Sequence, residues 1–341
     1  MNMGKILISG EYISAVLLMI LFSSGVLRAS GDQITEVPSI DYRTEMRSFV
    51  QKISSYARSQ NSRFLIIPQN GEELLTADGM PTGAVISEYV HAIDGIGRED
   101  LMFGYEGDDR ATPAEEEAYM QSFLSVAHKN GLSVLVTDYC STTAFVDKSY
   151  AGNAARGYIS FAADSRALDT VPQYPEQPYK AHSEDVKLLN NAHNFLYIIN
   201  PQRFESRQQF IAAIQRTDFD VVFVDLFFND EMPLTAEEVA SLKRKHNGGE
   251  RIVVCYMSIG EAETYRYYWR PEWIDNPPAW LDEENPHWEG NYKVRYWQTE
   301  WQKVIVGDAS SYLQKILDAQ FDGVYLDIID AFWYYENKNQ H

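Results

Sequence analysis

Eight short runs of apolar and β-branched residues recur along the chain, and most of them are separated by a segment long enough for a helix. The runs are RFLIIPQN, VHAIDGIG, LSVLVTDY, RGYISFAA, FLYIINP, DVVFVDLF, RIVVCYMSIG and DGVYLDIID. Strands that are apolar along their whole length are buried on both faces, and their alternation with helices indicates parallel pairing. The pattern predicts an α/β protein with a single (β/α)8 TIM barrel.

An open, doubly wound parallel sheet is the alternative architecture. That fold usually carries a glycine-rich phosphate loop after its first strand, but RFLIIPQNGEEL has neither a GxGxxG nor a Walker motif. With 341 residues, 45% of them hydrophobic, the chain can bury one large core. We therefore expect one barrel domain over residues 39–341.

An amphipathic helix is expected from residue 42 to residue 59, directly before the first strand. Its apolar residues recur at helical spacing, and they are Met46, Phe49, Val50, Ile53 and Ala57. Two irregular stretches interrupt the later pattern. A Pro-rich joining segment at about 167–194 could divide two half-barrels, and a Trp-rich insertion at 269–301 precedes the last strand.

The first 30 residues resemble an export signal. Lys5 precedes an apolar run at residues 13–22, which is short for a membrane span. We expect residues 1–30 to be a signal peptide or an N-terminal anchor, and the protein to be secreted or to lie in the periplasm or cell envelope. An uncleaved anchor would be its contact with a membrane.

The chain is acidic, with 29 Lys and Arg against 49 Asp and Glu and a formal net charge of -20. This charge repels nucleic acid and anionic lipid surfaces, so neither is an expected partner. It suits a neutral or cationic substrate, although acidic residues that only keep the surface soluble would give the same balance.

Several kinds of site find no support in the sequence. Cys140 and Cys255 are the only cysteines and are expected to be buried free thiols, with a bridge between them as the alternative. Seven histidines are scattered without an HxH or HExxH motif, so no metal or cofactor is expected. No GxSxG motif indicates a serine nucleophile.

Polar residues follow or end each expected strand, and in a barrel these ends meet on one face. They are Gln69, Asn70, Glu99, Asp138, Asp164, Arg166, Asn200, Asp225, Ser258, Glu261, Asp327 and Asp330. Opposed carboxylates can have separated pKa values, so that one is an acid while the other is ionised, as glycosidic cleavage requires. For any single carboxylate, a helix cap or a surface ion pair is the alternative interpretation.

Asp327 is the strongest individual candidate, because it interrupts the apolar run VYLDII, where an unpaired charge would be costly. Asp225 repeats the pattern in VFVDLF. Six tryptophans in the insertion could stack on sugar rings or simply pack the loop. They are Trp269, Trp273, Trp280, Trp288, Trp297 and Trp301.

Long motifs in the chain resemble a known family. FLYIINP, FDVVFVDLF, RIVVCYMSIGEAETYRYYW, FDGVYLDIIDAF, FLIIPQNGEELL and IDGIGREDL together resemble the glycoside hydrolases related to endo-α-1,4-polygalactosaminidase, glycoside hydrolase family 114. In the family pattern FLYIINP comes first, whereas here the second half of the barrel precedes it. The order resembles a circular permutation joined at 167–194, with a wrongly joined gene model as the alternative.

The resemblance implies particular site residues. Its acidic pair falls on Asp327 and Glu99, and it implies that Asn70, Glu261 and Arg266 position the substrate. Tyr325 stands where the family has an acidic residue. Further substrate-binding candidates are Gln69, Asp138, Asp225 and Asp330 from the strand ends, and Tyr325 itself.

The expected activity is endo-acting hydrolysis of an amino-sugar polysaccharide without a cofactor. Asp327 is expected to be the nucleophile or base, and Glu99 the acid. A catalytically silent carbohydrate-binding barrel is the alternative from another class of protein, and a neutral or cell-envelope polysaccharide is an alternative substrate.

Overall fold

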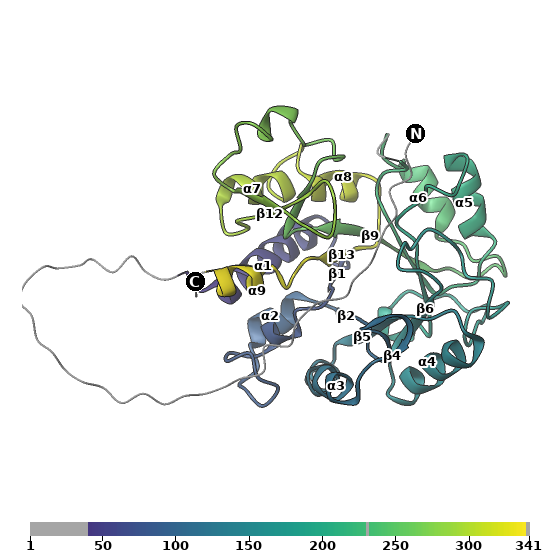
Figure 1. The fold of residues 1–341 in the computed structure, drawn as a ribbon. Coiled ribbons are helices and arrows are strands. Elements are labelled where there is room, and N and C mark those ends of the chain that lie inside the picture. Colours follow the sequence, from purple (N-terminus) through teal and green to yellow (C-terminus); the bar gives the residue numbers. More distant parts are fainter. Residues whose placement is uncertain (1–39, 230–231, 339–341) are drawn as a thin grey trace, which may run out of the picture.

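The computed structural model describes residues 40–229 and 232–338, so the predicted signal peptide or anchor at 1–30 lies outside the described residues (Figure 1). The strands are β1 Leu65–Pro68, β2 Gly95–Glu99, β3 Phe103–Gly104, β4 Gly107–Ala111, β5 Ser133–Tyr139, β6 Ile159–Ala163, β7 Phe195–Tyr197, β8 Val221–Val224, β9 Ile252–Ser258, β10 Glu261–Glu263, β11 Leu281–Glu284, β12 Asn291–Val294 and β13 Gly323–Asp327.

Helices lie around the strands (Figure 1). They are α1 Tyr42–Gln60, α2 Ser87–Ala92, α3 Ala114–Lys129, α4 Thr143–Ala155, α5 Arg207–Gln215, α6 Ala236–Leu242, α7 Thr299–Ile305, α8 Tyr312–Asp318 and α9 Ala331–Lys338. Three single turns of 3-10 helix are η1 Glu72–Leu75, η2 Leu189–Asn191 and η3 Pro271–Trp273.

Eight strands pair in parallel, and each comes from one of the eight predicted runs. Five form a sheet in the order β1-β13-β9-β8-β7, and three form a sheet in the order β2-β5-β6. Two single parallel bridges, Gln69 to Gly97 and Ser160 to Asn194, join the ends of the two sheets. The strands thus follow one another in chain order around a ring, and the predicted α/β class with parallel sheets is confirmed, as in TIM-barrel-like hydrolases.

The predicted helix at 42–59 is α1, and its five predicted apolar residues have no exposed surface. Asp41 caps its first turn, because its Oδ1 accepts a hydrogen bond of 3.0 Å from the Thr44 backbone N–H. The apolar stripe buries this helix against the strands. Truncation of one such buried side chain to alanine would cost about 2–5 kcal/mol of stability.

The second run, VHAIDGIG, differs from the expected strand. Val90 belongs to α2, and its backbone N–H donates to the Ile86 carbonyl at 3.1 Å. The strand begins only at Gly95. Asp94 marks the change, because its Oδ2 accepts from the Ile66 backbone N–H of β1 at 2.8 Å. A short apolar run does not distinguish the end of a helix from the start of a strand.

The joining segment at 167–194 is mostly irregular and is fastened to the amino ends of the strands. The Asn194 side chain donates to the Tyr179 carbonyl at 2.7 Å. Lys245 donates to the carbonyls of His182 and Glu184, both at 2.8 Å. The carbonyl groups of this irregular chain therefore find donors on the barrel.

The insertion between β9 and β13 forms a small antiparallel sheet in the order β10-β12-β11, beside α7 (Figure 1). Most of its tryptophans pack on one another. Ring centroids lie 4.9 Å apart for Trp273 and Trp280, and 5.0 Å for Trp280 and Trp301. The Trp301 indole N–H donates to the Ile259 carbonyl at 2.8 Å. Loop packing explains these rings, whereas Trp288 is 58% exposed.

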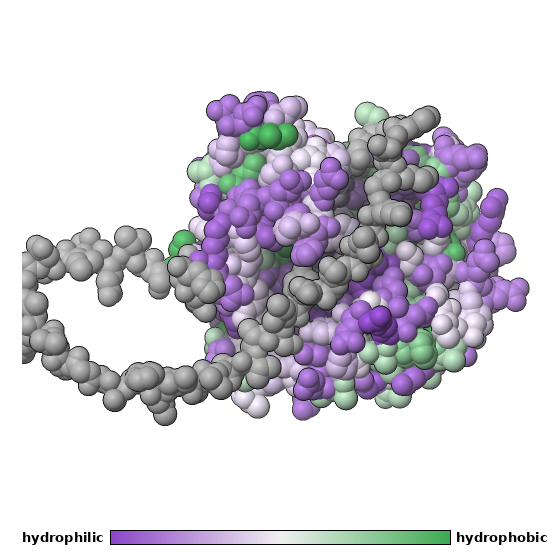
Figure 2. All heavy atoms as spheres, in the orientation of Figure 1, coloured by the Kyte–Doolittle hydropathy of each residue, from purple (hydrophilic) through white to green (hydrophobic). Residues whose placement is uncertain are grey.

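The face of the molecule shown in Figure 2 is mainly hydrophilic, with scattered apolar residues. Within the described residues, no helix is both long and apolar enough to cross a membrane. Cys140 and Cys255 are buried free thiols, as predicted, and the alternative of a bridge between them is wrong.

Candidate active site

Glu99 and Asp327 are the last residues of β2 and β13, and β1 lies between these two strands. Parallel strands present their carboxyl ends on one face, so both side chains belong to the same end of the ring. The structure therefore brings together the two carboxylates that the sequence singles out.

Three side chains donate hydrogen bonds to the Glu99 carboxylate. Gln69 Nε2 and Asn70 Nδ2 lie 2.6 and 3.2 Å from its Oε2, and the Tyr139 hydroxyl donates to its Oε1. The Asn70 Oδ1 also accepts from the Glu99 backbone N–H at 3.2 Å. Donors to both oxygens suit a carboxylate that carries a negative charge.

Asn70 reaches Glu99 because the chain turns sharply after β1. Asn70 and Gly71 both have a φ of 61°, in the left-handed region that Asn and Gly tolerate best. A methyl group on Gly71 would lie 2.9 Å from the Ile329 Cγ2, so the turn packs closely on the segment after β13. The Tyr197 hydroxyl fixes the Gln69 side chain, because it donates to the Gln69 Oε1 at 3.0 Å.

Asp327 lies in a different environment. Its Oδ2 accepts from the Tyr256 hydroxyl at 2.7 Å and its Oδ1 from the Ile328 backbone N–H at 2.8 Å. Burial, together with the negative charge of Glu99, raises the pKa of Asp327 to about 8. At neutral pH the unliganded site therefore carries a proton on Asp327.

Strained backbone follows Asp327. Ile328 has a φ of 57°, which is unusual for a β-branched residue. A methyl group on Gly260 would lie 2.2 Å from the Ile328 carbonyl oxygen, so only glycine fits beside this turn. Strain of this kind is found where the surrounding structure fixes a functional side chain.

Tyr325 lies one layer below the two carboxylates, since residues two apart in a strand point to the same side. Its ring stacks on Phe223 at 4.4 Å, and its hydroxyl is buried without a hydrogen-bond partner in the described residues. A methyl group on Gly97 would lie 2.0 Å from that hydroxyl, so Gly97 makes room for Tyr325.

A second cluster of acidic residues, Glu72, Glu73 and Asp330, lies beside the pair. Arg98 donates to both oxygens of the buried Glu72, at 3.0 and 3.2 Å. Burial raises the pKa of Asp330 to about 6, and the charge of Arg98 opposes this rise. Burial and the neighbouring Glu72 raise the pKa of Glu73 to about 7. Carboxylates with raised pKa values typically gather at functional sites.

Arg166 packs on Tyr139, the tyrosine that donates to Glu99. Its guanidinium lies 4.0 Å above the Tyr139 ring and donates to Asp100 at 2.8 Å and to the Gly104 carbonyl at 2.6 Å. Tyr139 is therefore clamped between this cation and the carboxylate that it contacts. Burial raises the pKa of Asp100 to about 6.

Asp138 was expected among the substrate-binding residues, and its burial does not agree with that role. It is 0% exposed and accepts from Ser149 at 2.6 Å, Asn153 at 3.0 Å and the Met102 backbone N–H at 2.7 Å. The side chain points outward to α4, because it alternates with the inward Tyr139. Asp138 thus fastens α4 and the loop after β2.

Asp225, Glu261 and Arg266 are also buried. Arg266 makes a bidentate pair with Asp225 at 2.8 and 2.7 Å, and its Nε donates to Glu263 at 2.5 Å. Glu261 accepts from Asn285 at 2.8 Å. These contacts anchor the insertion on the strand ends. Contact with substrate stays a prediction for these three residues.

The remaining strand-end residues have local partners. Asp164 is exposed and accepts from the Thr170 hydroxyl at 2.8 Å. Asn200 donates to the Ala167 carbonyl at 2.7 Å, and Ser258 donates to the Glu261 carbonyl at 3.3 Å. These contacts support the loops around the site.

Tyrosines are the residues that the sequence argument missed. Tyr139 and Tyr256 donate to Glu99 and Asp327, and Tyr197 holds Gln69. Strand alternation is the signal that could have found them, because each tyrosine lies on the inward face near the end of a strand.

The structure also gathers residues that sequence spacing kept apart. His182, His193 and Asp220 each offer a ligand atom, and these atoms lie within 4.8 Å of one another. The sequence argument predicted no metal site because the histidines form no short motif. Contact between the joining segment and the barrel brings them together, and sequence spacing gives no sign of that contact.

The fold and the site define an α/β protein with parallel sheets and paired carboxylates at the strand ends. Residues 181–341 match the model of glycoside-hydrolase family GH114. Over these residues the chain is GH114-like. The matched part contains Asp327 with its strand β13, whereas Glu99 lies in the part that precedes it.

Three relatives are uncharacterized proteins. MJ1477 of Methanocaldococcus jannaschii is 38% identical over 182 residues, 52% of this chain and 49% of that protein. A Thermotoga maritima protein is 48% identical over 87 residues, 26% of each chain. A Deinococcus radiodurans protein is 37% identical over 126 residues, 37% of this chain and 38% of that protein. The matches span about half or less of these relatives.

Among solved structures, the chain resembles Aspergillus fumigatus Ega3 in its crystal structure with galactosamine. The TM-score is 0.25 and the identity 21%, over 40% of this chain and 43% of that chain.

Proposed function

We propose that this protein is a glycoside hydrolase that cleaves an amino-sugar polysaccharide, similar to polygalactosamine, with Glu99 and Asp327 as its catalytic pair. The observation that carries the proposal is the placement of these two carboxylates at the ends of β2 and β13, with different hydrogen-bond partners. Glycosidic cleavage needs one carboxyl group that is protonated and one that is ionised. The match of residues 181–341 to a glycoside-hydrolase family supports the same reaction class.

The acidic surroundings favour a cationic polymer. The charge of Asp330 acts on Asp327, the charge of Glu72 acts on Asp330, and the chain as a whole carries a formal net charge of -20. Ammonium groups of an amino sugar would be attracted to this end of the ring. A neutral polysaccharide would not benefit from these charges.

In the unliganded site the raised pKa of Asp327, about 8, keeps its carboxyl group protonated at neutral pH. The resemblance implies the other order, with Asp327 as nucleophile or base and Glu99 as acid. The ammonium of a bound amino sugar would stabilise the Asp327 carboxylate and lower its pKa. In this proposal the proton passes to Glu99 when the substrate binds, and Glu99 then protonates the leaving oxygen.

We further infer that the ring of parallel strands is a closed (β/α)8 barrel with a circularly permuted chain. The family match begins at residue 181, inside the joining segment at 167–194. The strands before this segment adjoin those after it at the Ser160–Asn194 bridge and at the pairing of β1 with β13. The proposed location, secreted or in the periplasm or cell envelope, depends on residues 1–30 and is tested by amino-terminal sequencing of the exported protein.

The second candidate function is a carbohydrate-binding barrel without activity. Tyr325 favours it, because this buried tyrosine stands where the resemblance implies an acidic residue, and its hydroxyl has no partner in the described residues. Because Tyr325 is neutral, one carboxylate fewer lies near the pair than the resemblance implies.

Reducing-end release distinguishes the two candidates. The protein is incubated with partially deacetylated polygalactosamine and with a panel of neutral polysaccharides, and new reducing ends are counted over time. Release from the amino-sugar polymer supports the hydrolase, and release only from a neutral polymer changes the substrate class. Binding to a polymer without any release over a long incubation supports the binding module.

A further inference from the structure

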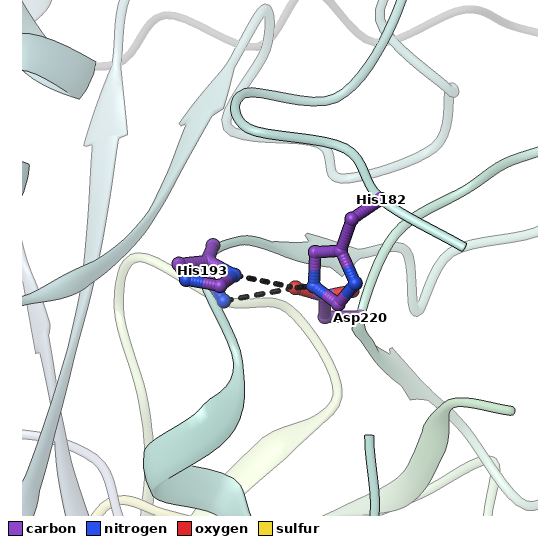
Figure 3. Close-up of side chains that lie close together, drawn as sticks. All are labelled: His182, His193 and Asp220. Carbon is purple, nitrogen blue, oxygen red and sulfur yellow. Dashed lines mark hydrogen bonds and ion pairs between the residues drawn. The ribbon is translucent and has the colours of Figure 1, made fainter. Parts of the chain in front are cut away.

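His182, His193 and Asp220 converge at the end of the ring opposite to Glu99 and Asp327 (Figure 3). His182 belongs to the joining segment, His193 lies two residues before β7, and Asp220 lies directly before β8. All three therefore lie at the amino ends of strands or on the chain that covers them.

One oxygen of Asp220 is the centre of this group. Its Oδ2 lies 3.1 Å from His182 Nε2 and 3.6 Å from His193 Nδ1. A tetrahedral zinc ion with ligands at about 2.0–2.1 Å requires ligand atoms about 3.3 Å from one another. The two measured separations lie on either side of that value.

The nitrogens of the two histidine rings need only a small movement to reach this spacing. The three ligand atoms lie within 4.8 Å of one another, so the two ring nitrogens have to approach by at most about 1.5 Å to reach the tetrahedral spacing. The His193 side chain is 47% exposed and can move towards solvent, whereas the Asp220 side chain is 0% exposed and held by Lys245.

Lys245 sets the charge of the group. Its Nζ has no exposed surface and donates to Asp220 Oδ1 at 3.1 Å, and also to the His182 and Glu184 carbonyls. It orients the carboxylate so that Oδ2 faces the histidines, and its positive charge weakens the attraction for a second cation. His182 Nδ1 is buried without a partner in the described residues, so this ring lacks the usual outer hydrogen bond. We therefore expect an ion that chelators can remove.

We propose that His182 Nε2, His193 Nδ1 and Asp220 Oδ2 bind a divalent transition-metal ion of the zinc class, with water as the fourth ligand on the exposed side of His193. Two imidazoles and one carboxylate are a ligand set that zinc accepts. The ion would fasten the joining segment to the amino ends of β7 and β8. This proposal is independent of the catalytic carboxylates.

The experiment uses the full chain without a histidine tag. The protein is stripped with a chelator and dialysed against Zn²⁺, and its metal content is measured by elemental analysis. Co²⁺ is then used as a spectroscopic probe. The variants are His182→Ala and His193→Ala, and the matched control is His246→Ala, an exposed histidine next to Lys245 in the sequence.

We expect one equivalent of zinc in the wild type, the visible absorption of tetrahedral Co²⁺, and a melting temperature that rises with Zn²⁺ concentration. Both variants should lose all three effects, and His246→Ala should keep them. Because the His193 side chain is half exposed, its variant is expected to fold, which circular dichroism checks. A wild type that retains no zinc, or a His193→Ala protein that binds it equally well, would overturn the proposal and leave an ion-pair cluster around Asp220.

Discussion

Asp327 owes its properties to two neighbours and to burial. Within the described part of the chain, the side chain accepts two hydrogen bonds, from the Tyr256 hydroxyl and from the Ile328 backbone N–H, while Glu99 adds a like charge nearby. Glu99 is held by three donors, two from the turn after β1 and one from β5. Two carboxyl groups with the same intrinsic chemistry therefore differ in protonation because of where they lie.

The pH profile of turnover follows from this difference. Because the pKa of Asp327 is raised to about 8, Asp327 carries its proton at neutral pH and loses it as the pH rises through 8. Cleavage requires that proton, whichever carboxylate donates it. We expect kcat/KM to fall above about pH 8, measured over a pH series with a soluble amino-sugar oligomer. A profile that stays level to pH 10 would contradict this assignment.

Tyr139 should matter through Glu99. Tyr139→Phe removes one charge-assisted hydrogen bond, which is worth about 1.5–3 kcal/mol, so we expect kcat to fall roughly 10-fold to 100-fold. Tyr150→Phe is the matched control, since this buried hydroxyl accepts from the Ala162 backbone N–H and does not contact the pair. Steady-state kinetics measure kcat for both variants. Equal losses of kcat would show a general effect on folding and not a role of Tyr139 at Glu99.

At the residue scale the sequence predicted the positions of the two carboxylates but not their partners. Asp327 interrupts an apolar run, and that signal is visible in one sequence. Asp138 was also predicted from its position at a strand end, yet it faces outward, and the neighbouring Tyr139 is the residue that contacts Glu99. Alternation specifies two faces of a strand, and only the register of the packed structure tells which of them is inside.

At the element scale, the turn after β13 positions the catalytic end of that strand. Ile328 takes a φ of 57°, and its carbonyl oxygen closely approaches Gly260 after β9. The strain is tolerated because both strands are fixed by their parallel pairing from Gly323 to Asp327. A substitution at Gly260 or at Ile328 should therefore displace the Asp327 side chain.

Gly260→Ala tests that contact. The added methyl group would lie 2.2 Å from the Ile328 carbonyl, so the turn has to shift. We expect a loss of about 1–3 kcal/mol in the free energy of unfolding, together with lower kcat. Gly131→Ala is the control, because its φ of 83° is also strained for alanine but nothing lies within 4 Å. Urea unfolding and kinetics should show a stability loss in both variants and a kcat loss only in Gly260→Ala.

The elements themselves were largely predictable. Eight apolar runs gave eight parallel strands, and helical spacing gave α1 to within one residue. The start of β2 was not predictable, because Val90 completes a helix although it begins an apolar run. The antiparallel sheet of the insertion was also missed, since its strands are only three or four residues long.

At the scale of the whole molecule, the described ends of the chain lie together. Arg43 of α1 pairs with Glu336 of α9 at 2.8 Å, and the rings of Tyr42 and Tyr335 lie 5.6 Å apart. The ring of strands is continuous across these two helices, because β13 pairs with β1. The order of the strands along the chain can therefore change while each strand keeps the same neighbouring strands.

A second permutation tests this account of the fold. The variant begins at residue 181, next to the exposed Lys180, and joins residue 338 to residue 40 through a short Gly-Ser linker. We expect it to fold cooperatively with the circular dichroism spectrum of the parent protein, because few contacts are broken. A variant opened between Val222 and Phe223, inside β8, is the control and should not fold. A first variant that fails to fold, as the control does, would contradict the inferred permutation.

The most direct test of the central claim measures reducing-end release from partially deacetylated polygalactosamine by Asp327→Asn, Glu99→Gln and the control Asp164→Asn. Asp164 is an exposed carboxylate at the end of another strand and takes no part in the pair. The account predicts that both pair variants fold normally and lose nearly all turnover, while Asp164→Asn retains the wild-type rate. Wild-type turnover in either pair variant would remove that carboxylate from the mechanism and contradict the paired-carboxylate site.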